Sequence, residues 1–428
     1  MIVEFSVKNF RSIKELQTIS FVASGLKSAE ENILVDARNI ATDGNMRLLK
    51  TVGIYGANAS GKSNIIKAIE YFLRAVRSEA SSESNLGALY DPFLYEERGE
   101  DTECFFQLVL IVNQKKFRYG FTVRLNPASQ EKSTREMIGS EWLFGTKEKN
   151  AGEYFTRKRQ EVQTDKLDNE QRIPALPYPH TLFLTHAAAF DREGVCAQIR
   201  SFIRSWTISN FGASFENFRF GTIQLIEILR RKEDFLRLLR SFNLYYDDVI
   251  IEKDPHKPNF DEIDYEKIFF VKKVAGKDTF VRLNLGLTES AGTQKLFDIS
   301  GFLLRAFALP IGGFINLDEI DSTFHPALLI RLIGLFNDPS INTNAIQVLF
   351  TSYDTNLLSP AILRRDQVYF TEKGEDDATR LYSLADLKGI RNDADFARNY
   401  LAGYYGAIPI LEQFCQNTPT QVDGTLGK

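Results

Sequence analysis

The chain has 428 residues, of which 43% are hydrophobic and 25% are charged, and its formal net charge is −4. This composition is that of a globular chain long enough for two or three domains, and it argues against a generally basic coat for nucleic acid. Three widely spaced cysteines suggest neither a zinc site nor a disulfide framework. No uncharged run approaches the ~20 residues that span a bilayer, and the opening segment lacks signal-peptide features. We therefore expect a cytoplasmic protein.

Residues 1–10 alternate as in a strand, and the first motif with clear chemistry follows at TVGIYGANASGKSNIIKAI. An apolar strand precedes a glycine-rich loop of the pattern GxxxxGKS, and a segment with helical spacing follows it. Such a loop turns its N–H groups toward phosphates, its lysine lies between the β- and γ-phosphates, and its serine can ligate Mg²⁺. The predicted nucleotide-binding residues are Gly56, Asn58, Ala59, Ser60, Gly61, Lys62, Ser63 and Asn64, with Ser63 also a metal ligand. A glycine-rich turn without chemistry is the weaker alternative, because strand, loop and helix stand in the required order.

The sequence pattern in the middle of the chain predicts a strand hairpin, polar loops and then a helical region. From about residue 101 to 123, CFFQLVLIV and KFRYGFTV are typical of a strand hairpin over the nucleotide core, and the polar stretches 128–136 and 147–172 are typical of surface loops. From about residue 187 to 246 the pattern turns helical. Five basic residues lie on its second part, at Arg230, Arg231, Lys232, Arg237 and Arg240. We interpret them as the solvated face of a helical lid, with contact to nucleic acid or a partner as the alternative.

Two consecutive carboxylates follow an apolar strand at GGFINLDEIDSTFHP, residues 312–326. Paired acids after a strand are more often solvated turn residues, but here they complete a phosphate-binding loop. Asp318 is therefore predicted to ligate Mg²⁺, and Glu319 to orient or deprotonate the water that attacks the γ-phosphate. Both acids and Lys62 are assigned to catalysis.

A small-residue helix start lies between these motifs, at ESAGT, residues 289–293. Taken alone it is a serine-capped helix, with apolar residues Leu296, Ile299 and Leu303 on one face. The free N–H groups and the dipole of such a helix start also attract a phosphate.

These motifs together resemble the ABC-type ATPases of the SMC and RecF kind. The resemblance implies that Ser290 and Gly292 close over ATP held by another subunit, that Arg11 of the NFRS segment lies near the nucleotide, and that Asp321 belongs to a loop that crosses between subunits. It also implies an α/β fold: a P-loop NTPase of ABC-ATPase head type, with a mixed sheet flanked by helices, an antiparallel β subdomain and a helical insertion. The expected division is 1–185 for the first part of the head, 186–280 for the helical insertion or lid, and 281–428 for the second part.

More narrowly, the stretches ESAGT, LDEIDSTFHP, TSYDTNLL and LAGYYGAIP resemble the ATPase subunit of AbiL- or RloA-type bacterial defence systems. This resemblance implies an anti-phage or toxin–antitoxin role beside a separate TOPRIM-type nuclease of RloB kind, with a phage protein as trigger and without a membrane partner. The superfamily resemblance implies a homodimer or larger homo-oligomer that shares ATP between subunits. No sustained heptad pattern predicts a long coiled-coil arm. The alternative is a RecF-like repair ATPase that binds DNA directly.

One position departs from the superfamily. Tyr353 stands in the switch segment TSYD, where a histidine commonly touches the γ-phosphate. Because a tyrosine hydroxyl has a pKa near 10, it stays neutral at pH 7 and predicts slow turnover. His325 is a substitute candidate, although a His-Pro pair at a helix start favours simple capping.

Overall fold

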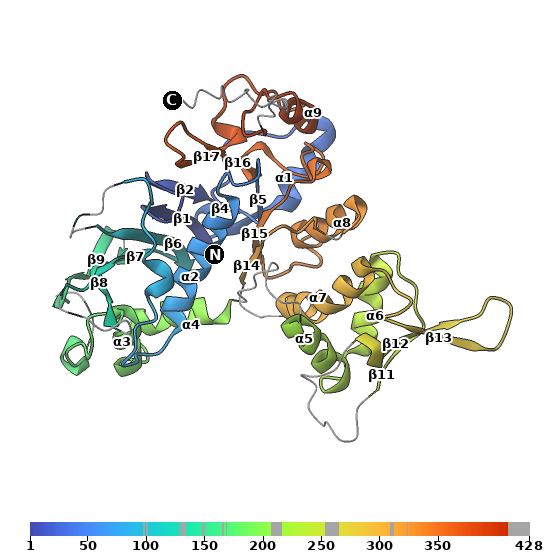
Figure 1. The fold of residues 1–428 in the computed structure, drawn as a ribbon, viewed down its shortest axis with the longest axis horizontal. Coiled ribbons are helices and arrows are strands. Elements are labelled where there is room, and N and C mark those ends of the chain that lie inside the picture. The colour runs from blue at the N-terminus through green and yellow to red at the C-terminus, as the bar shows by residue number, and fades with distance from the viewer. Residues whose placement is uncertain are drawn as a thin grey trace, which may run out of the picture.

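The computed structural model describes residues 1–409 except positions 97–98, 100–101, 128, 130–133, 148–149, 165–166, 168, 207–215, 253–264, 309–311 and 323. A five-stranded sheet lies at the centre, in the order β14-β15-β5-β16-β17 (Figure 1). The first four strands are parallel and β17 is antiparallel to β16, so the predicted mixed sheet is confirmed. Its strands are β5 (Thr51–Gly56), β14 (Phe314–Leu317), β15 (Gln347–Thr351), β16 (Val368–Lys373) and β17 (Thr379–Ser383).

Both faces of this sheet are covered, which explains its continuous apolar strands. On β5, Val52 and Ile54 pack with one hydrophobic core, whereas Tyr55 packs with the other. The first core contains α2 (Lys62–Arg77), and the second contains side chains of α7 (Ala291–Ala308), α8 (Pro326–Asn337) and α9 (Phe396–Leu401). Strand alternation therefore gives the sheet two buried faces.

A seven-stranded antiparallel sheet covers the opposite side of α2, in the order β10-β9-β8-β7-β6-β1-β2. The ring of Phe72 on α2 stacks on Phe121 of this sheet, with 5.1 Å between ring centroids. The predicted hairpin is confirmed, and Asn113 and Gln114 form its two-residue turn with φ of 50° and 63°, as the twist of a tight hairpin requires. The strands are β1 (Ile2–Lys8), β2 (Gln17–Ser20), β6 (Cys104–Val112), β7 (Lys115–Leu125), β8 (Glu136–Lys147), β9 (Asn150–Lys158) and β10 (Glu161–Gln163). A small sheet of β3 (Ile40–Asp43) and β4 (Met46–Leu49) follows α1 (Ile33–Asn39).

The prediction of a surface loop over residues 147–172 is wrong over residues 150–163, because β9 and β10 lie there. Phe155 is fully buried, and Arg157 on the same strand is also buried, where its Nη1 lies 3.2 Å from Glu141 Oε2. The buried ion pair made a core strand look polar in the sequence. Positions 128 and 130–133 of the other predicted loop lie outside the described residues.

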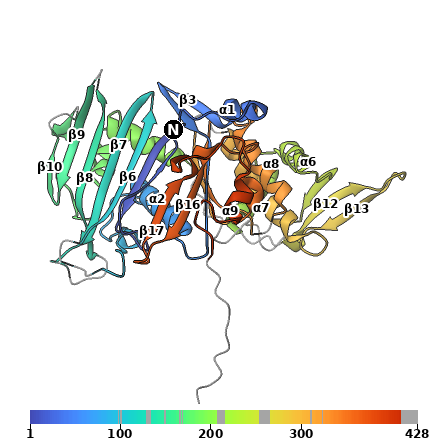
Figure 2. The ribbon, with the colours of Figure 1, turned by 90° about the horizontal axis from the view of Figure 1, so that it is seen from above.

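A second lobe carries α5 (Glu216–Glu227), α6 (Lys232–Ser241) and a three-stranded sheet, packed with α7. Figure 2 shows the hairpin of β12 and β13 at the opposite end of the molecule from the seven-stranded sheet. The strands of the lobe are β11 (Asp248–Ile251), β12 (Ile268–Lys273) and β13 (Phe280–Asn284). The predicted helical insertion thus also contains strands. Its second helical stretch is broken near Arg230, whose φ of 56° a continuing helix does not allow.

Two further helices, α3 (Phe183–Phe190) and α4 (Val195–Ser205), pack with the first core, whereas α5 and α6 pack with the second. The expected domain boundaries stay a prediction. In the part of the chain that the structure describes, no helix combines the length and the apolar character that crossing a membrane requires.

Candidate functional site

The glycine-rich loop joins the carboxyl end of β5 to the start of α2. Gly56 and Gly61 have φ of 151° and 109°, and Ala59 between them has φ of 60°. A Cβ on Gly61 would lie 2.1 Å from Thr379 Oγ1, so both the backbone conformation and the close packing require glycine there. The loop is therefore compact, and the first N–H groups of the 16-residue helix α2 are available for an anion.

Lys62 is the first residue of α2, and its side chain turns back onto the loop. Its Nζ donates hydrogen bonds to the carbonyl oxygens of Gly56 and Ala57, at 2.8 and 2.9 Å, and lies 4.0 Å from the centroid of the Tyr353 ring. Burial lowers the pKa of Lys62 to about 8, although the nearby carboxylates of Asp318 and Glu319 act in the opposite direction. This ammonium group is a cation that a phosphate would stabilise.

The two predicted acids follow β14, next to the loop. Ser63 Oγ donates to Asp318 Oδ1 at 3.2 Å, which joins the two predicted metal ligands across 255 positions of sequence. A hydroxyl and a carboxylate are hard oxygen donors, which Mg²⁺ prefers. Among the described residues no group of three or more His, Cys, Asp or Glu side chains is arranged so that it alone could hold a metal ion. This donor set fits Mg²⁺, which is usually held by one or two protein oxygens together with substrate phosphates and water.

Glu319 is exposed and has a φ of 50°, an uncommon conformation for a non-glycine residue. Its backbone N–H donates to Thr351 Oγ1 at 2.7 Å, and Thr351 Oγ1 donates to Asp318 Oδ1 at 2.6 Å. The carboxylate of Glu319 is thus placed in solvent beside Asp318, where it is accessible to a bound substrate.

A hydrogen bond joins the segment of Tyr353 to the side chain of Asp321. The backbone N–H of Tyr353 donates to Asp321 Oδ2 at 2.9 Å. Burial raises the pKa of Tyr353, and the carboxylates of Glu319, Asp321 and Asp318 raise it further. The phenol is therefore neutral at pH 7, as the sequence predicts.

The opening turn reaches the same loop through Ser12 rather than through Arg11. Ser12 Oγ accepts from Asn64 Nδ2 at 2.7 Å and lies 2.7 Å from Thr379 Oγ1, while Arg11 Nε lies 3.3 Å from Asp91 Oδ2. The Arg11 guanidinium also lies 5.6 Å from the centroid of the Tyr71 ring on α2. The predicted contact of Arg11 with a nucleotide stays a prediction.

The predicted signature lies at the start of α7. Ser290 Oγ accepts from Thr293 N at 3.2 Å, which is the helix cap that the sequence predicts. No contact of Ser290 or Gly292 with the phosphate loop occurs in the described part of the chain. One turn further along α7, Lys295 Nζ donates to Ser322 Oγ at 3.0 Å, so the helix is joined to the loop that carries Asp321.

His325 caps α8, since its Nδ1 accepts from Ala327 N at 3.2 Å. The capping interpretation is confirmed for this residue. Asn58 is exposed on the phosphate loop, and Ser60 Oγ is buried 2.7 Å from Thr371 Oγ1.

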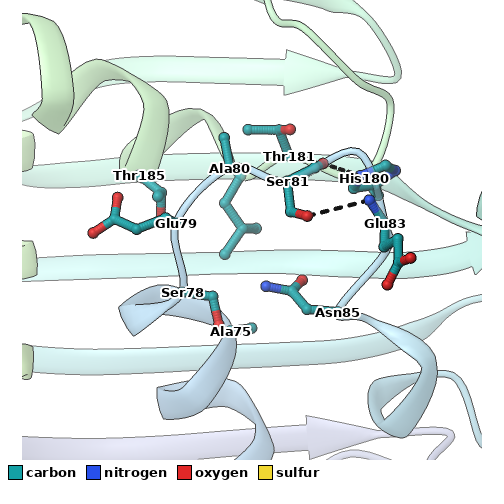
Figure 3. Close-up of a pocket in the computed structure, with 11 residues that line it drawn as sticks. Ala75, Ser78, Glu79, Ala80, Ser81, Glu83, Asn85, His180, Thr181 and Thr185 are labelled. Carbon is teal, nitrogen blue, oxygen red and sulfur yellow. Dashed lines mark hydrogen bonds between the residues drawn. The ribbon is translucent and has the colours of Figure 1, made fainter. Parts of the chain in front are cut away.

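A polar hollow elsewhere on the molecule does not compete with this site. It lies between the segment after α2 and the segment before α3, where His180 Nε2 is 2.9 Å from the carbonyl oxygen of Ser81 (Figure 3). Its volume of about 10 Å³ holds about one water molecule, and it is far too small for a nucleotide.

Sequence reasoning missed three hydroxyl residues of the site: Ser12, Thr351 and Thr379. Thr351 stands two positions before Tyr353 and directly follows the apolar stretch AIQVLF, which is typical of a strand, so its placement beside the acids could have been inferred. Thr379 lies on a strand that no motif marks, and its contact with the loop depends on the tertiary fold.

Comparisons with known proteins give a family match and remote structural likenesses. Residues 52–359 match the family model "AAA domain, putative AbiEii toxin, Type IV TA system", and no curated protein matches the chain. Among solved structures, the chain is similar to the SMC head domain from Thermotoga maritima, with 15% identity, a TM-score of 0.44, and coverage of 89% of this chain and 98% of that chain. It is also similar to the recombination mediator protein RecF of the RecFOR pathway, with 12% identity, a TM-score of 0.31 and the same two coverages. Both structural likenesses are remote, and no residue role is taken from them.

Proposed function

The chain belongs to this family of AbiEii-type AAA domains, and from that premise we propose that it is the sensor and scaffold of a bacterial anti-phage or toxin–antitoxin system, driven by ATP. Its membership supports the predicted ATPase activity, and the ABC type is part of the proposal. The narrower resemblance to AbiL- and RloA-type subunits is part of the proposal, whereas the family description supports only the broader toxin–antitoxin connection.

One observation carries the catalytic part of the proposal: the phosphate loop and the acids form a single site. Ser63 Oγ lies 3.2 Å from Asp318 Oδ1, and Lys62 lies beside them. ATP would lie on the loop, with Ser63 and Asp318 holding Mg²⁺, which when bound neutralises phosphate charge. Lys62 would donate to the phosphates, and Glu319 would orient or deprotonate the attacking water.

We further propose that two copies of the chain share each nucleotide. Ser290 and Gly292 lie at the start of an 18-residue helix, and Ser290 is exposed there, so a partner's phosphate can approach it. The structural link from Lys295 to Ser322 offers a route by which this helix and the Asp321 loop move together. ATP would then join the two copies, and hydrolysis would separate them.

The assembled form would restrain a separate nuclease of TOPRIM type in the cytosol, until a phage protein acts as the trigger. The test is a plating assay with the gene in its native neighbourhood. We expect the wild type to reduce phage plating and Glu319→Gln, which stays assembled, to abolish the reduction. Lys62→Ala, which cannot assemble, should leave the nuclease unrestrained and slow the growth of uninfected cells. Equal plating on wild-type and variant cells, at equal protein levels, would contradict the proposal.

The alternative of a RecF-like ATPase that binds DNA directly has less support. Three of the five basic residues for which nucleic-acid contact was the alternative interpretation are paired with acids: Arg231 and Arg237 with Asp234, and Lys232 with Asp248. Tight DNA binding that falls steeply with salt concentration would favour this alternative.

A further inference from the structure

Thr351 is the last residue of β15, is fully buried, and pairs with Ile54 of β5. Its hydroxyl makes two hydrogen bonds, donating to Asp318 Oδ1 at 2.6 Å and accepting from the backbone N–H of Glu319 at 2.7 Å. One side chain thus contacts both members of the acidic pair. Only a hydroxyl can donate and accept in this way within so small a volume.

The backbone of Thr351 contributes to the same turn. The carbonyl oxygen of Thr351 accepts a hydrogen bond from Ile320 N at 3.2 Å. Ile320 directly follows Glu319, the residue with positive φ in the turn after β14. Residues held in such a conformation persist only where their surroundings fix them. Thr351 therefore fixes the conformation from which the Glu319 side chain extends.

We propose that Thr351 is a positioning residue for ATP hydrolysis, which holds the Asp318 carboxylate against Ser63 and the Glu319 backbone in its productive conformation. This inference rests on the roles of Asp318 and Glu319 in the proposed function. Ser63 donates to the same Oδ1 atom of Asp318, at 3.2 Å, so Thr351 and Ser63 orient that carboxylate together. Groups that orient a metal ligand commonly change metal affinity or activity 10–100-fold when they are removed.

The test compares Thr351→Val, which keeps the shape and removes both side-chain hydrogen bonds, with Thr351→Ser, which keeps the hydroxyl. Thr122→Val is the matched control, because Thr122 is a buried strand threonine of the antiparallel sheet whose Oγ1 accepts one bond, from Ser140 N at 2.9 Å. Two quantities are measured: kcat for ATP hydrolysis, and the Mg²⁺ concentration that half-saturates binding of a fluorescent ATP analogue.

We expect Thr351→Val to lower kcat by ~10–100-fold or to raise the half-saturating Mg²⁺ concentration by a comparable factor. Thr351→Ser and Thr122→Val should stay within about threefold of the wild type in both quantities, a margin well inside the effect expected for the valine variant. A Thr351→Val protein that melts earlier but keeps both wild-type values would overturn the inference, since Thr351 would then be structural only.

The Mg²⁺ measurement separates this inference from the proposed function. If the wild type hydrolyses no ATP, the catalytic assignment of Glu319 fails, but the dependence of nucleotide binding on Mg²⁺ still decides whether Thr351 positions Asp318. If the wild type hydrolyses ATP and the valine variant matches it in both measurements, only the role of Thr351 is refuted.

Discussion

The pKa of Lys62 predicts that ATP affinity depends on pH in an unusual range. Burial lowers this pKa from 10.5 to about 8. About nine tenths of the side chain is then charged at pH 7, and about one tenth at pH 9. Because the phosphates of ATP favour the ammonium form, binding above pH 8 must be accompanied by proton uptake. The apparent Kd should therefore rise about tenfold from pH 7 to pH 9.

The lowered pKa of Lys62 affects folding stability in the opposite direction: ATP affinity falls as the pH rises, whereas the free energy of unfolding increases. The unfolded chain holds the Lys62 proton more tightly than the folded chain, so this group adds stability as the pH rises from about 8 toward 10.5. Loss of affinity at pH 9 is thus not expected to come from unfolding at this residue, and circular dichroism checks that the protein stays folded.

Calorimetric titration with ATP at constant ionic strength, in buffers of different ionisation enthalpy, measures both Kd and proton uptake. Lys62→Ala is the control: it should bind ATP much more weakly, because the phosphate charge is left uncompensated, and with a Kd that is flat between pH 7 and pH 9. A wild-type Kd that is constant over this range, with no proton uptake, would refute the reasoning.

Three further predictions concern hydrolysis and stability. Glu319→Gln should still bind ATP but release phosphate at least ~10²-fold more slowly, the usual cost of losing a general base, and wild-type release would reject that role. Tyr353→His should raise the slow hydrolysis rate, because an imidazole can carry charge at pH 7 where the phenol cannot, and a lower rate would contradict this. Arg157→Met should destabilise the fold by ~3–5 kcal/mol in denaturant titrations, since Glu141 keeps a buried charge, while leaving ATP affinity unchanged; a cost below about 1 kcal/mol would argue against it.

The phosphate loop was predictable because its chemistry is local. Residues 56–63 are contiguous, and the strand and helix that flank them have clear patterns. The acids were predictable for the same reason, although only the fold brings Asp318 within 3.2 Å of Ser63. The contact of the Tyr353 ring with Lys62 was not predictable, because it depends on how the segment after β15 turns.

The sequence-based prediction was wrong where charged residues are buried, because charged residues are normally typical of exposed loops. Arg157 is buried in an ion pair with Glu141, and it lies on β9, a strand that a polar composition led us to predict as a loop. The end of α5 was missed for another reason: apolar spacing continues through residue 229, while the break depends on the backbone conformation of Arg230. Apolar periodicity predicts which face of a helix is buried, but it does not show where a helix ends and the next one begins.

The central claim is that ATP is bound between two copies of the chain, and mixing two inactive variants tests it most directly. Lys62→Ala lacks the lysine of the phosphate loop, and Ser290→Arg blocks the helix start that would face a partner's phosphate. In a mixed dimer, one site contains both defects and the other contains neither. We predict that the mixture hydrolyses ATP faster than either variant alone at the same total concentration. If no ratio of the two variants exceeds its parents, although each parent binds the other, each chain hydrolyses ATP alone and the claim is wrong.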